Sequence, residues 1–301
     1  MRVFITGTTG YIGGSVADLL LRSGHRVDGL VRSEDKAREL ERRGINPVIG
    51  TLDDAALLTA RAREADAVVN AASSDHRGAV EALVEGLAGT GRPLVHTSGS
   101  TVVSTDSRGA VADEVYTEEA IAPGSGWRPI EKKVARVALD RFVLDAASRD
   151  VRSVVLCNSL IYGHGRGMSR DSLQVPVLAR QARESGVARY VGEGRNIWST
   201  VHIDDLTDLY LRALTDAPAG SFYFVENGEA SFRDIATAIA RKFGLGPAEA
   251  WDTDTAVAHW GEELTLYVLA SNSRIRGRAS AALGWRPAHA SVLDWVRDDL
   301  D

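Results

Sequence analysis

Short apolar runs alternate with amphipathic stretches through the first half of the chain. The apolar runs predict strands over residues 3–5, 27–31, 47–50, 67–71, 93–97 and 151–156. Between them, apolar residues recur at helical spacing and predict helices over residues 12–23, 37–43, 55–64, 80–87 and 127–148. Strands that alternate with helices in this way predict a parallel sheet covered on both faces, a doubly wound α/β fold.

The pattern changes after residue 157. A long polar connection over residues 101–126 ends in Pro-Gly-Ser-Gly, and loops of this length inside a domain are often functional. The later pattern predicts helices over 173–184, 204–214, 232–243, 278–283 and 292–300, with strands over 197–202 and 222–225. We expect residues 158–301 to form mainly a smaller α/β substrate region, with 202–225 returning to extend the first sheet.

The first strand runs straight into a glycine-spaced turn that opens the first helix. Gly7, Gly10 and Gly13 follow a G-x-x-G-x-x-G spacing, with Thr9, Tyr11 and Ile12 between them. In a dinucleotide-binding unit the first glycine allows the sharp turn, the second admits a pyrophosphate, and the third lets helix and strand pack closely. The helix N-terminus then offers free N–H groups to phosphates. Residues 1–157 are therefore predicted to be a dinucleotide-binding Rossmann domain.

The tip of the second strand predicts which nucleotide is bound. An acidic residue there accepts the ribose 2′-hydroxyl of NAD in folds of this kind. Here the tip carries Arg32 and then Ser33. A cation suits a 2′-phosphate, so the sequence predicts NADP(H); the plainer alternative is a solvated arginine at a strand end.

The remaining strand ends predict the rest of the cofactor edge, because cofactors lie across the carboxyl ends of parallel strands. The residues placed there are Thr51, Leu52, Ala71, Ala72, Ser73, Thr97 and Asn158.

Composition excludes several other classes of protein. The 301 residues are 44% hydrophobic and 25% charged, and the net charge of −6 argues against nucleic acid or an anionic membrane as partner. The single cysteine, Cys157, excludes an internal disulfide framework, and the seven histidines lack metal-ligand spacing. No apolar run is long enough to cross a bilayer, and a strand starting at Arg2 leaves no room for a signal peptide. We expect a cytoplasmic protein without a metal.

Four segments together resemble the extended short-chain dehydrogenase/reductases, the superfamily of nucleotide-sugar epimerases and dehydratases. They are Thr6–Gly13, Asn158–Gly163 (Asn-Ser-Leu-Ile-Tyr-Gly), Val201–Leu206 (Val-His-Ile-Asp-Asp-Leu) and Leu283–Pro287 (Leu-Gly-Trp-Arg-Pro). The resemblance covers nearly the whole chain and implies a Rossmann fold that binds a nicotinamide cofactor.

The catalytic pattern departs from that family, which uses a serine or threonine and then Tyr-x-x-x-Lys. Lys132 fits the lysine, which would hold the nicotinamide ribose, but Arg128 stands four residues earlier in place of tyrosine. The serine position falls on Gly99, with Ser98 and Ser100 beside it. A guanidinium cannot act as a general acid at neutral pH, although it stabilises an oxyanion or clamps a carboxylate. Arg128 is therefore a candidate electrostatic catalyst, a substrate clamp, or a helix-start residue without a role.

Other side chains are candidates for the substrate pocket. Tyr162 is a candidate proton donor, and His164, Met168 and Trp198 are candidate lining residues; the alternatives are core packing or a solvated loop. His202, at the end of a strand, is interpreted as a hydrogen-bonded structural histidine.

These observations favour an NADPH-dependent reductase of a small carbonyl, imine or iminium, or enone substrate. An iminium is already protonated and would need no acid. The lost tyrosine also fits a non-catalytic NADP(H)-binding redox sensor, whereas a nucleotide-sugar epimerase or dehydratase needs that tyrosine as a base. The helix over 127–148 and its neighbour at 76–90 are candidates for a homodimer interface.

Overall fold

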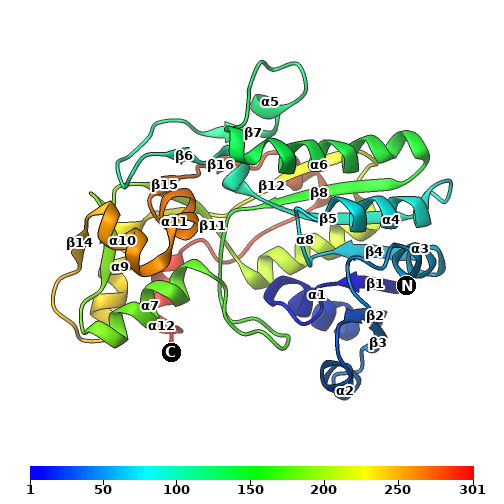
Figure 1. Cartoon of the computed structure of the whole chain (residues 1–301), viewed down its shortest axis with the longest axis horizontal. Coiled ribbons are helices and arrows are strands. Elements are labelled where there is room, and N and C mark those ends of the chain that lie inside the picture. The colour runs from blue at the N-terminus through cyan, green and yellow to red at the C-terminus, as the bar shows by residue number, and fades with distance from the viewer.

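The computed structural model describes residues 1–301 and is built on a seven-stranded parallel sheet with the order β12-β8-β5-β4-β1-β2-β3 (Figure 1). Its strands are β1 (Arg2–Thr6), β2 (Arg26–Val31), β3 (Asn46–Ile49), β4 (Ala67–Asn70), β5 (Pro93–Gly99), β8 (Arg152–Asn158) and β12 (Ser221–Val225). The predicted doubly wound parallel α/β fold is confirmed. Since β12 pairs with β8, a segment from the second half of the chain forms one edge of this sheet.

Helices cover both faces of the sheet because the side chains on each face are mainly apolar. One face packs on α1 (Tyr11–Arg22), α2 (Glu34–Arg42) and α8 (Ile203–Asp216). The other packs on α3 (Ala55–Glu64), α4 (Arg77–Leu87) and α6 (Val134–Asp145). Within β5, Leu94 faces the second group and Val95 faces the first, as the two-residue period of a strand requires.

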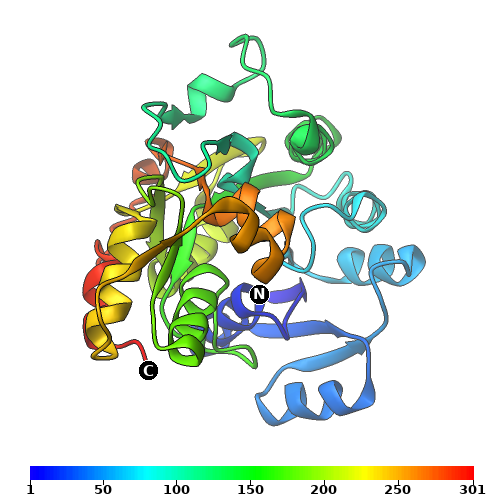
Figure 2. The same ribbon diagram turned by 60° about the vertical axis from the view of Figure 1, so that its left-hand side comes forward.

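A second lobe lies beside the sheet and has its own apolar core (Figure 2). Its helices are α7 (Gln174–Ser185), α9 (Phe232–Lys242), α10 (Thr253–Trp260), α11 (Glu262–Leu264) and α12 (Val292–Asp298), with a π-helical turn over Thr265–Leu269. Its strands include β9 (Leu160–Tyr162), β11 (Ile197–His202) and β13 (Glu229–Ser231), which form a small sheet, and β10 (Arg189–Val191), which pairs with β14 (Glu249–Trp251). No helix of the chain is both long and apolar enough to span a bilayer.

The predicted long connection over 101–126 is tied to the far end of the chain. A 3₁₀ turn (Ser100–Val103) precedes β6 (Thr105–Asp106), which pairs with β15 (Ser271–Asn272). Next, β7 (Tyr116–Thr117) pairs with β16 (Ile275–Arg276), and a short α5 (Glu118–Ile121) follows. Hydrophobic periodicity does not detect two-residue strands, so these pairings were not predicted.

Two predicted helices differ in the structure. The helix predicted over 127–148 begins with a 3₁₀ turn at Glu131–Lys133, continues as α6, and ends with another 3₁₀ turn at Ala146–Arg149. Pro129 disfavours helical backbone at the residue before it, and Ile130 is extended (φ −59°, ψ 152°). The helix predicted over 278–283 is a 3₁₀ turn at Ala279–Leu283.

Asp205 anchors the C-terminal segment to α8. Its buried carboxylate accepts hydrogen bonds from the backbone N–H of Ala288 (2.9 Å) and His289 (2.8 Å). Asp205→Ala removes both acceptors, and hydrogen bonds to a charged group each contribute roughly 1.5–3 kcal/mol. We expect the free energy of unfolding in urea to fall by about 2–4 kcal/mol.

The matched control is Asp208→Ala on the same helix. Asp208 pairs with Arg212 near the surface, where ion pairs contribute about 0–1 kcal/mol. Equal losses in the two variants would contradict the anchoring role of Asp205.

Candidate functional site

A cavity of about 490 Å³ opens at the carboxyl edge of the sheet, where the two lobes meet. The ends of β4, β5 and β8 form one side, and β9, β11 and the segment before α7 form the other. The lining residues are Tyr11, Ile12, Ala71, Ala72, Ser73, Ser74, Thr97, Ser98, Gly99, Ser100, Thr101, Arg136, Asn158, Ser159, Ile161, Asp171, Ser172, Leu173, Gln174 and Trp198. Many residues predicted for the cofactor edge, the catalytic serines and the substrate pocket therefore share one cavity.

Close packing in the turn between β1 and α1 requires glycine at two positions. Gly7 has φ +84°, and a Cβ there would lie 2.6 Å from the carbonyl carbon of Ala71. A Cβ on Gly13 would lie 2.3 Å from the carbonyl oxygen of Gly7. At Gly10 the nearest atom would be 3.3 Å away, so this glycine is less crowded. The backbone here has the compact form of a phosphate-binding turn.

The N-terminus of α1 has unpaired donors. Gly10 is the N-cap residue and has no side chain to accept from the helix. The backbone N–H groups of Tyr11, Ile12 and Gly13 make no hydrogen bond within the protein. Free N–H groups and the positive end of the helix dipole favour an anion, so this turn fits the pyrophosphate of a dinucleotide.

Arg32 lies at the carboxyl end of β2, where the exposed chain turns into α2. It makes no ion pair and no hydrogen bond, and Ser33 is the N-cap residue of α2. Thr51 and Leu52 follow β3 along the same edge of the sheet. None of these four residues lines the cavity itself. Their place at this edge of the sheet is the one predicted for cofactor-binding residues.

Arg136 is the cation that α6 presents to the cavity. Its Nε donates to Asp75 Oδ1 at 2.7 Å, and a second guanidinium nitrogen contacts the other carboxylate oxygen. Another nitrogen lies 3.3 Å from Thr101 Oγ1. Asp75 raises the pKa of Arg136, and Arg136 holds the pKa of Asp75 below its usual value. The guanidinium is thus held rigidly in position and stays charged at the cavity wall.

The two predicted serines lie at the same end of the cavity. Ser98 is buried on β5, and its hydroxyl donates to Asp140 Oδ2 on α6 at 2.7 Å. Ser100 is also buried, and the hydroxyl of Ser273 donates to both its carbonyl oxygen and its Oγ at 2.8 Å. The cavity wall therefore contains the Ser98 hydroxyl, which is hydrogen-bonded to the Asp140 carboxyl group, close to the Arg136 guanidinium.

The structure places neither Arg128 nor Lys132 in this cavity. Arg128 is exposed in the segment before the helix, and its one hydrogen bond goes to the carbonyl of Trp127 at 3.5 Å. Lys132 is also exposed; it pairs with Glu263, and its ammonium lies 4.0 Å from the ring centre of Tyr267. The neighbouring Lys133 is buried, and burial and Arg136 lower its pKa. Because Pro129 delays the helix, the electrostatic role expected of Arg128 has no geometric support.

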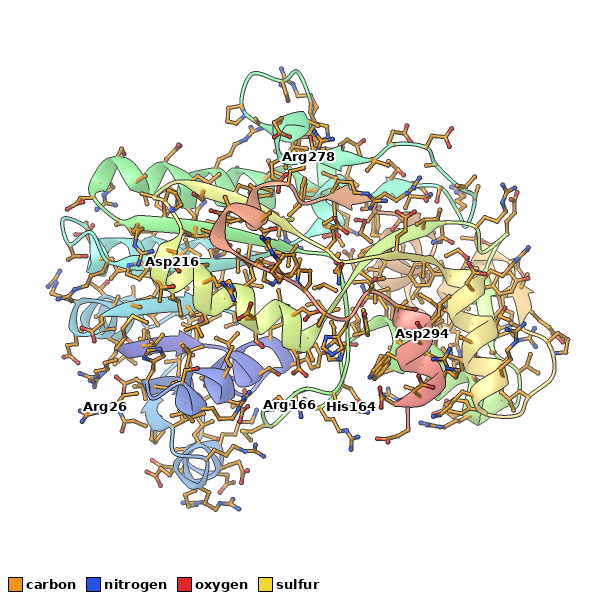
Figure 3. The ribbon with its side chains drawn as sticks, turned by 180° about the vertical axis from the view of Figure 1, so that it is seen from behind. Arg26, His164, Arg166, Asp216, Arg278 and Asp294 are labelled. Atoms are coloured by element: carbon orange, nitrogen blue, oxygen red, sulfur yellow. The ribbon has the colours of Figure 1, made fainter.

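Three of the other pocket candidates lie outside the cavity. Tyr162 is buried in the second lobe, its hydroxyl donates to the carbonyl of His289, and burial raises its pKa. His164 hydrogen-bonds the carbonyl of Asp299 at 2.9 Å, on the side of the molecule seen in Figure 3. Met168 lies against α1 in a smaller hollow. Only Trp198 lines the cavity, and its Nε1 donates to the carbonyl of Ser271.

Sequence reasoning missed Arg136, although a signal was present. Lys132 and Arg136 are four residues apart, the spacing of tyrosine and lysine in the family motif. Since the family motif has lysine at its second position, Lys132 fits that position and Arg136 does not. The lining residues Asp171–Gln174 were missed because only the folded chain brings that segment to β5 and β8.

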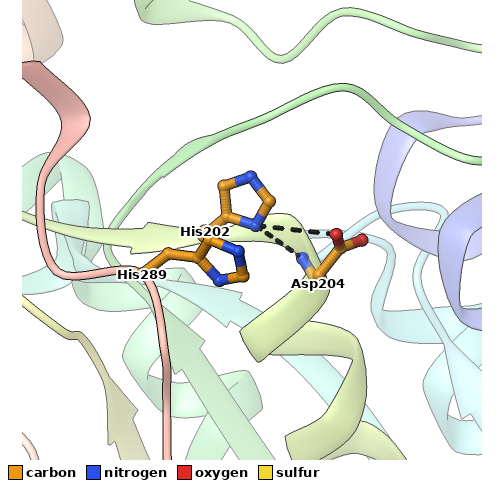
Figure 4. A group of neighbouring side chains, drawn as sticks. All are labelled: His202, Asp204 and His289. Atoms are coloured by element: carbon orange, nitrogen blue, oxygen red, sulfur yellow. Dashed lines mark hydrogen bonds and ion pairs between the residues drawn. The ribbon is translucent and has the colours of Figure 1, made fainter. Parts of the chain in front are cut away.

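His202, Asp204 and His289 form a separate cluster where β11 meets α8 (Figure 4). Nδ1 of His202 accepts from the backbone N–H of Asp204, so this nitrogen caps the helix. Arg166 pairs with Asp204, and His289 stacks on His202 with ring centres 4.0 Å apart. Burial and His289 lower the pKa of His202 to about 4, in keeping with the structural role expected from the sequence.

Comparisons with known proteins agree with this architecture. The chain is 32% identical to an uncharacterized protein of Schizosaccharomyces pombe, over 99% of both chains. It is 34% identical to the oxidase ucsJ of an Acremonium species, over 95% of this chain and 92% of that one. A 3-diazoavenalumate denitrifying reductase from Streptomyces is 28% identical over 98% of each.

Solved structures share the fold at lower identity. The dTDP-glucose 4,6-dehydratase of Bacillus anthracis, in complex with NAD, superposes with a TM-score of 0.76 at 17% identity and covers all of this chain and 95% of its own. The family model for NAD dependent epimerases/dehydratases matches residues 3–225, which include the central sheet except for Arg2, the first residue of β1. The chain belongs to the NAD dependent epimerase/dehydratase family.

Proposed function

We propose that this protein is an NADPH-dependent reductase of a small carbonyl, imine or enone substrate. The observation that carries the proposal is the shared cavity: the N-terminus of α1 opens onto the same space as Ser98 and Arg136. Hydride transfer from a nicotinamide nucleotide requires a phosphate-binding turn and polar side chains for the substrate in the same cleft. The relatives named as an oxidase and a reductase over nearly full length support an oxidoreductase.

Residues at the β1–α1 turn and along the sheet edge support cofactor binding. Gly7, Gly10 and Gly13 would let the backbone approach the pyrophosphate, and Arg32 would pair with a 2′-phosphate. Ala71–Ser73, Thr97 and Asn158 would follow the cofactor across the sheet edge toward the cavity. When bound there, the nicotinamide supplies a hydride. The protein positions the substrate, stabilises the charge that develops on it and provides a proton.

Specificity for NADPH over NADH is part of the proposal. The dehydratase neighbour holds NAD, but at 17% identity it shares the fold alone. In this chain Arg32 has no carboxylate partner, so its guanidinium is available to a phosphate. The nearest acidic side chains, Glu34 and Asp35, follow in the first turn of α2 and not at the tip of β2.

Arg136 takes the electrostatic role in the proposed reaction. Since Asp75 and Thr101 already hold it, the guanidinium needs no reorganisation to face a substrate oxygen. We expect Arg136→Met to lower kcat/KM for NADPH-dependent reduction about 100-fold, as the loss of one oxyanion donor does. Arg136→Lys should restore only part of the lost kcat/KM. Lysine keeps the positive charge but lacks the planar guanidinium with its fixed set of donors.

The control is Arg149→Met in the 3₁₀ turn that follows α6, since Arg149 pairs with Glu85 and lines neither the main cavity nor the cavity beside Asp140. It should leave steady-state kinetics unchanged. Arg136→Met with wild-type kcat/KM would remove Arg136 from the mechanism.

The function itself is tested by incubating the purified protein with NADPH and a panel of electrophiles. Suitable probes are ethyl acetoacetate, 2-cyclohexenone and 2-methyl-1-pyrroline, and NADPH oxidation is followed by absorbance. We expect turnover with at least one class. Tight NADPH binding without turnover across the panel would favour the redox-sensor alternative.

A further inference from the structure

Ser98, Asp140 and His96 form a buried polar group behind the cavity wall, and Ser98 is the member that lines the main cavity. Asp140 lies on α6 and accepts the Ser98 hydroxyl on Oδ2. Its other oxygen, Oδ1, has no hydrogen-bond partner and faces His96 Nε2 at 3.6 Å. A buried carboxyl group with one unpartnered oxygen is costly as an anion, so the site favours a bound proton.

Hydrogen bonds on the far side fix the tautomer of His96. Thr6 Oγ1 donates to Asn70 Oδ1 at 2.6 Å, so the Asn70 amide nitrogen faces His96. That nitrogen lies 3.0 Å from His96 Nδ1 and donates to it. Burial lowers the pKa of His96 to about 4, so the ring is neutral and carries its proton on Nε2.

Titratable groups surround Asp140 on several sides. Arg136 lies one turn earlier on α6, Asp75 approaches from the segment after β4, and Cys157 and His96 face it from β8 and β5. Burial dominates and raises the pKa of Asp140 to about 7, while Ser98 and Arg136 oppose the rise. Both protonation states of Asp140 are therefore accessible at neutral pH.

The two protonation states of Asp140 orient the Ser98 hydroxyl differently. When Asp140 is ionised, the Ser98 proton points at the carboxylate. When Asp140 is protonated on Oδ2, its O–H donates to Ser98 Oγ, and the serine proton is free to point into the cavity. Only the protonated state of Asp140 therefore frees the Ser98 hydroxyl to donate into the cavity.

We propose that Ser98 donates the proton to the substrate oxygen or nitrogen and that Asp140 resupplies it, in place of the missing tyrosine. The inference rests on the proposed reduction. As the C=O bond becomes C–O–H, the carbon takes the hydride that the nicotinamide supplies and the oxygen takes the Ser98 proton. The Asp140 proton moves to Ser98 Oγ, which leaves a carboxylate.

A second cavity provides the return path for the proton. Asp140 also lines a second cavity of about 330 Å³ between α5, α6 and β12, whose walls combine the apolar Val102, Trp127 and Phe222 with the charged Glu118, Glu119 and Arg141. Because Ser98 does not line this cavity, a proton that returns through it to Asp140 does not cross the substrate. Ser98 is thus the catalytic residue of the step, and Asp140 acts through it as a positioning and proton-storing residue.

The proposal is tested without turnover by ¹³C NMR of protein labelled at aspartate carboxyl carbons. The signal that disappears in Asp140→Asn should titrate near pH 7. In Ser98→Ala it should titrate higher, because the carboxylate has lost its donor. An Asp140 signal that titrates below pH 5 would overturn the proposal.

Kinetics on whichever panel probe turns over give the second test. In the wild type, kcat should fall tenfold per pH unit above about pH 7, since the protonated acid is the active form. Ser98→Ala should lower kcat at least 100-fold with little change in KM. Asp140→Asn, which retains the shape of the side chain, should abolish the pH dependence even if Ser98→Ala does not fold.

The control is Ser104→Ala, a buried serine that bonds only the carbonyl of Thr101 and lies outside the cavity. It should keep the wild-type pH profile. Turnover with an unchanged profile in Ser98→Ala and Asp140→Asn would overturn this proposal alone. NADPH binding without turnover in the wild type would instead overturn the proposed function, and this step with it.

Discussion

Gly13→Ala is expected to abolish useful dinucleotide binding. The added Cβ would lie 2.3 Å from the carbonyl oxygen of Gly7 and 2.7 Å from its carbonyl carbon, so backbone on one side of the turn has to move. Gly7 cannot yield easily, because it is itself packed against Ala71. We expect the dissociation constant for NADPH, measured by calorimetry, to rise at least ~30-fold, equivalent to about 2 kcal/mol.

The control is Gly78→Ala in the first turn of α4. A Cβ there meets only a His76 carbon, at 3.9 Å, so alanine fits a helix without a clash. Circular dichroism should show both variants folded. If Gly13→Ala binds NADPH as the wild type does, the turn does not hold the pyrophosphate.

Arg32→Asp is expected to reverse the cofactor preference. A charge-assisted hydrogen bond to the 2′-phosphate contributes roughly 1.5–3 kcal/mol, and the new carboxylate adds repulsion. We expect NADPH affinity to fall about 10- to 100-fold. NADH affinity should hold or rise, because aspartate accepts the ribose hydroxyls.

Arg26→Asp is the matched control for this change. Arg26 begins the same strand, is exposed, and lies at the opposite edge of the sheet (Figure 3). The two variants change net charge equally, so long-range electrostatics affects both. Equal loss of NADPH affinity in the two would show that Arg32 makes no specific contact.

The sheet and its cofactor edge follow from the sequence because their signals are local. Residues 55–64 and 197–202 were predicted at the observed bounds of α3 and β11. An apolar run three to six residues long with a glycine turn behind it is visible without knowledge of what it packs against. The roles of Gly7 and Gly13 could be inferred likewise, since close approach between adjacent elements permits few other residues.

Which arginine faces the cavity could not be predicted in the same way, because it depends on where α6 begins. The helix was predicted from residue 127, but its 3₁₀ turn begins at Glu131 and α6 at Val134, which removes Arg128 from the site and leaves Arg136 facing the cavity. The Ser98–Asp140 contact joins residues 42 positions apart, and no periodicity reports it. The small pairings of 105–117 with 271–276 were missed for the same reason.

Calorimetric titration of the wild-type protein with NADPH and NADH, at one pH and ionic strength, tests the central claim most directly. The account predicts one site per chain and at least tenfold tighter binding of NADPH. Equal affinity for the two would contradict the role of Arg32, and no binding of either would contradict the cofactor cradle itself.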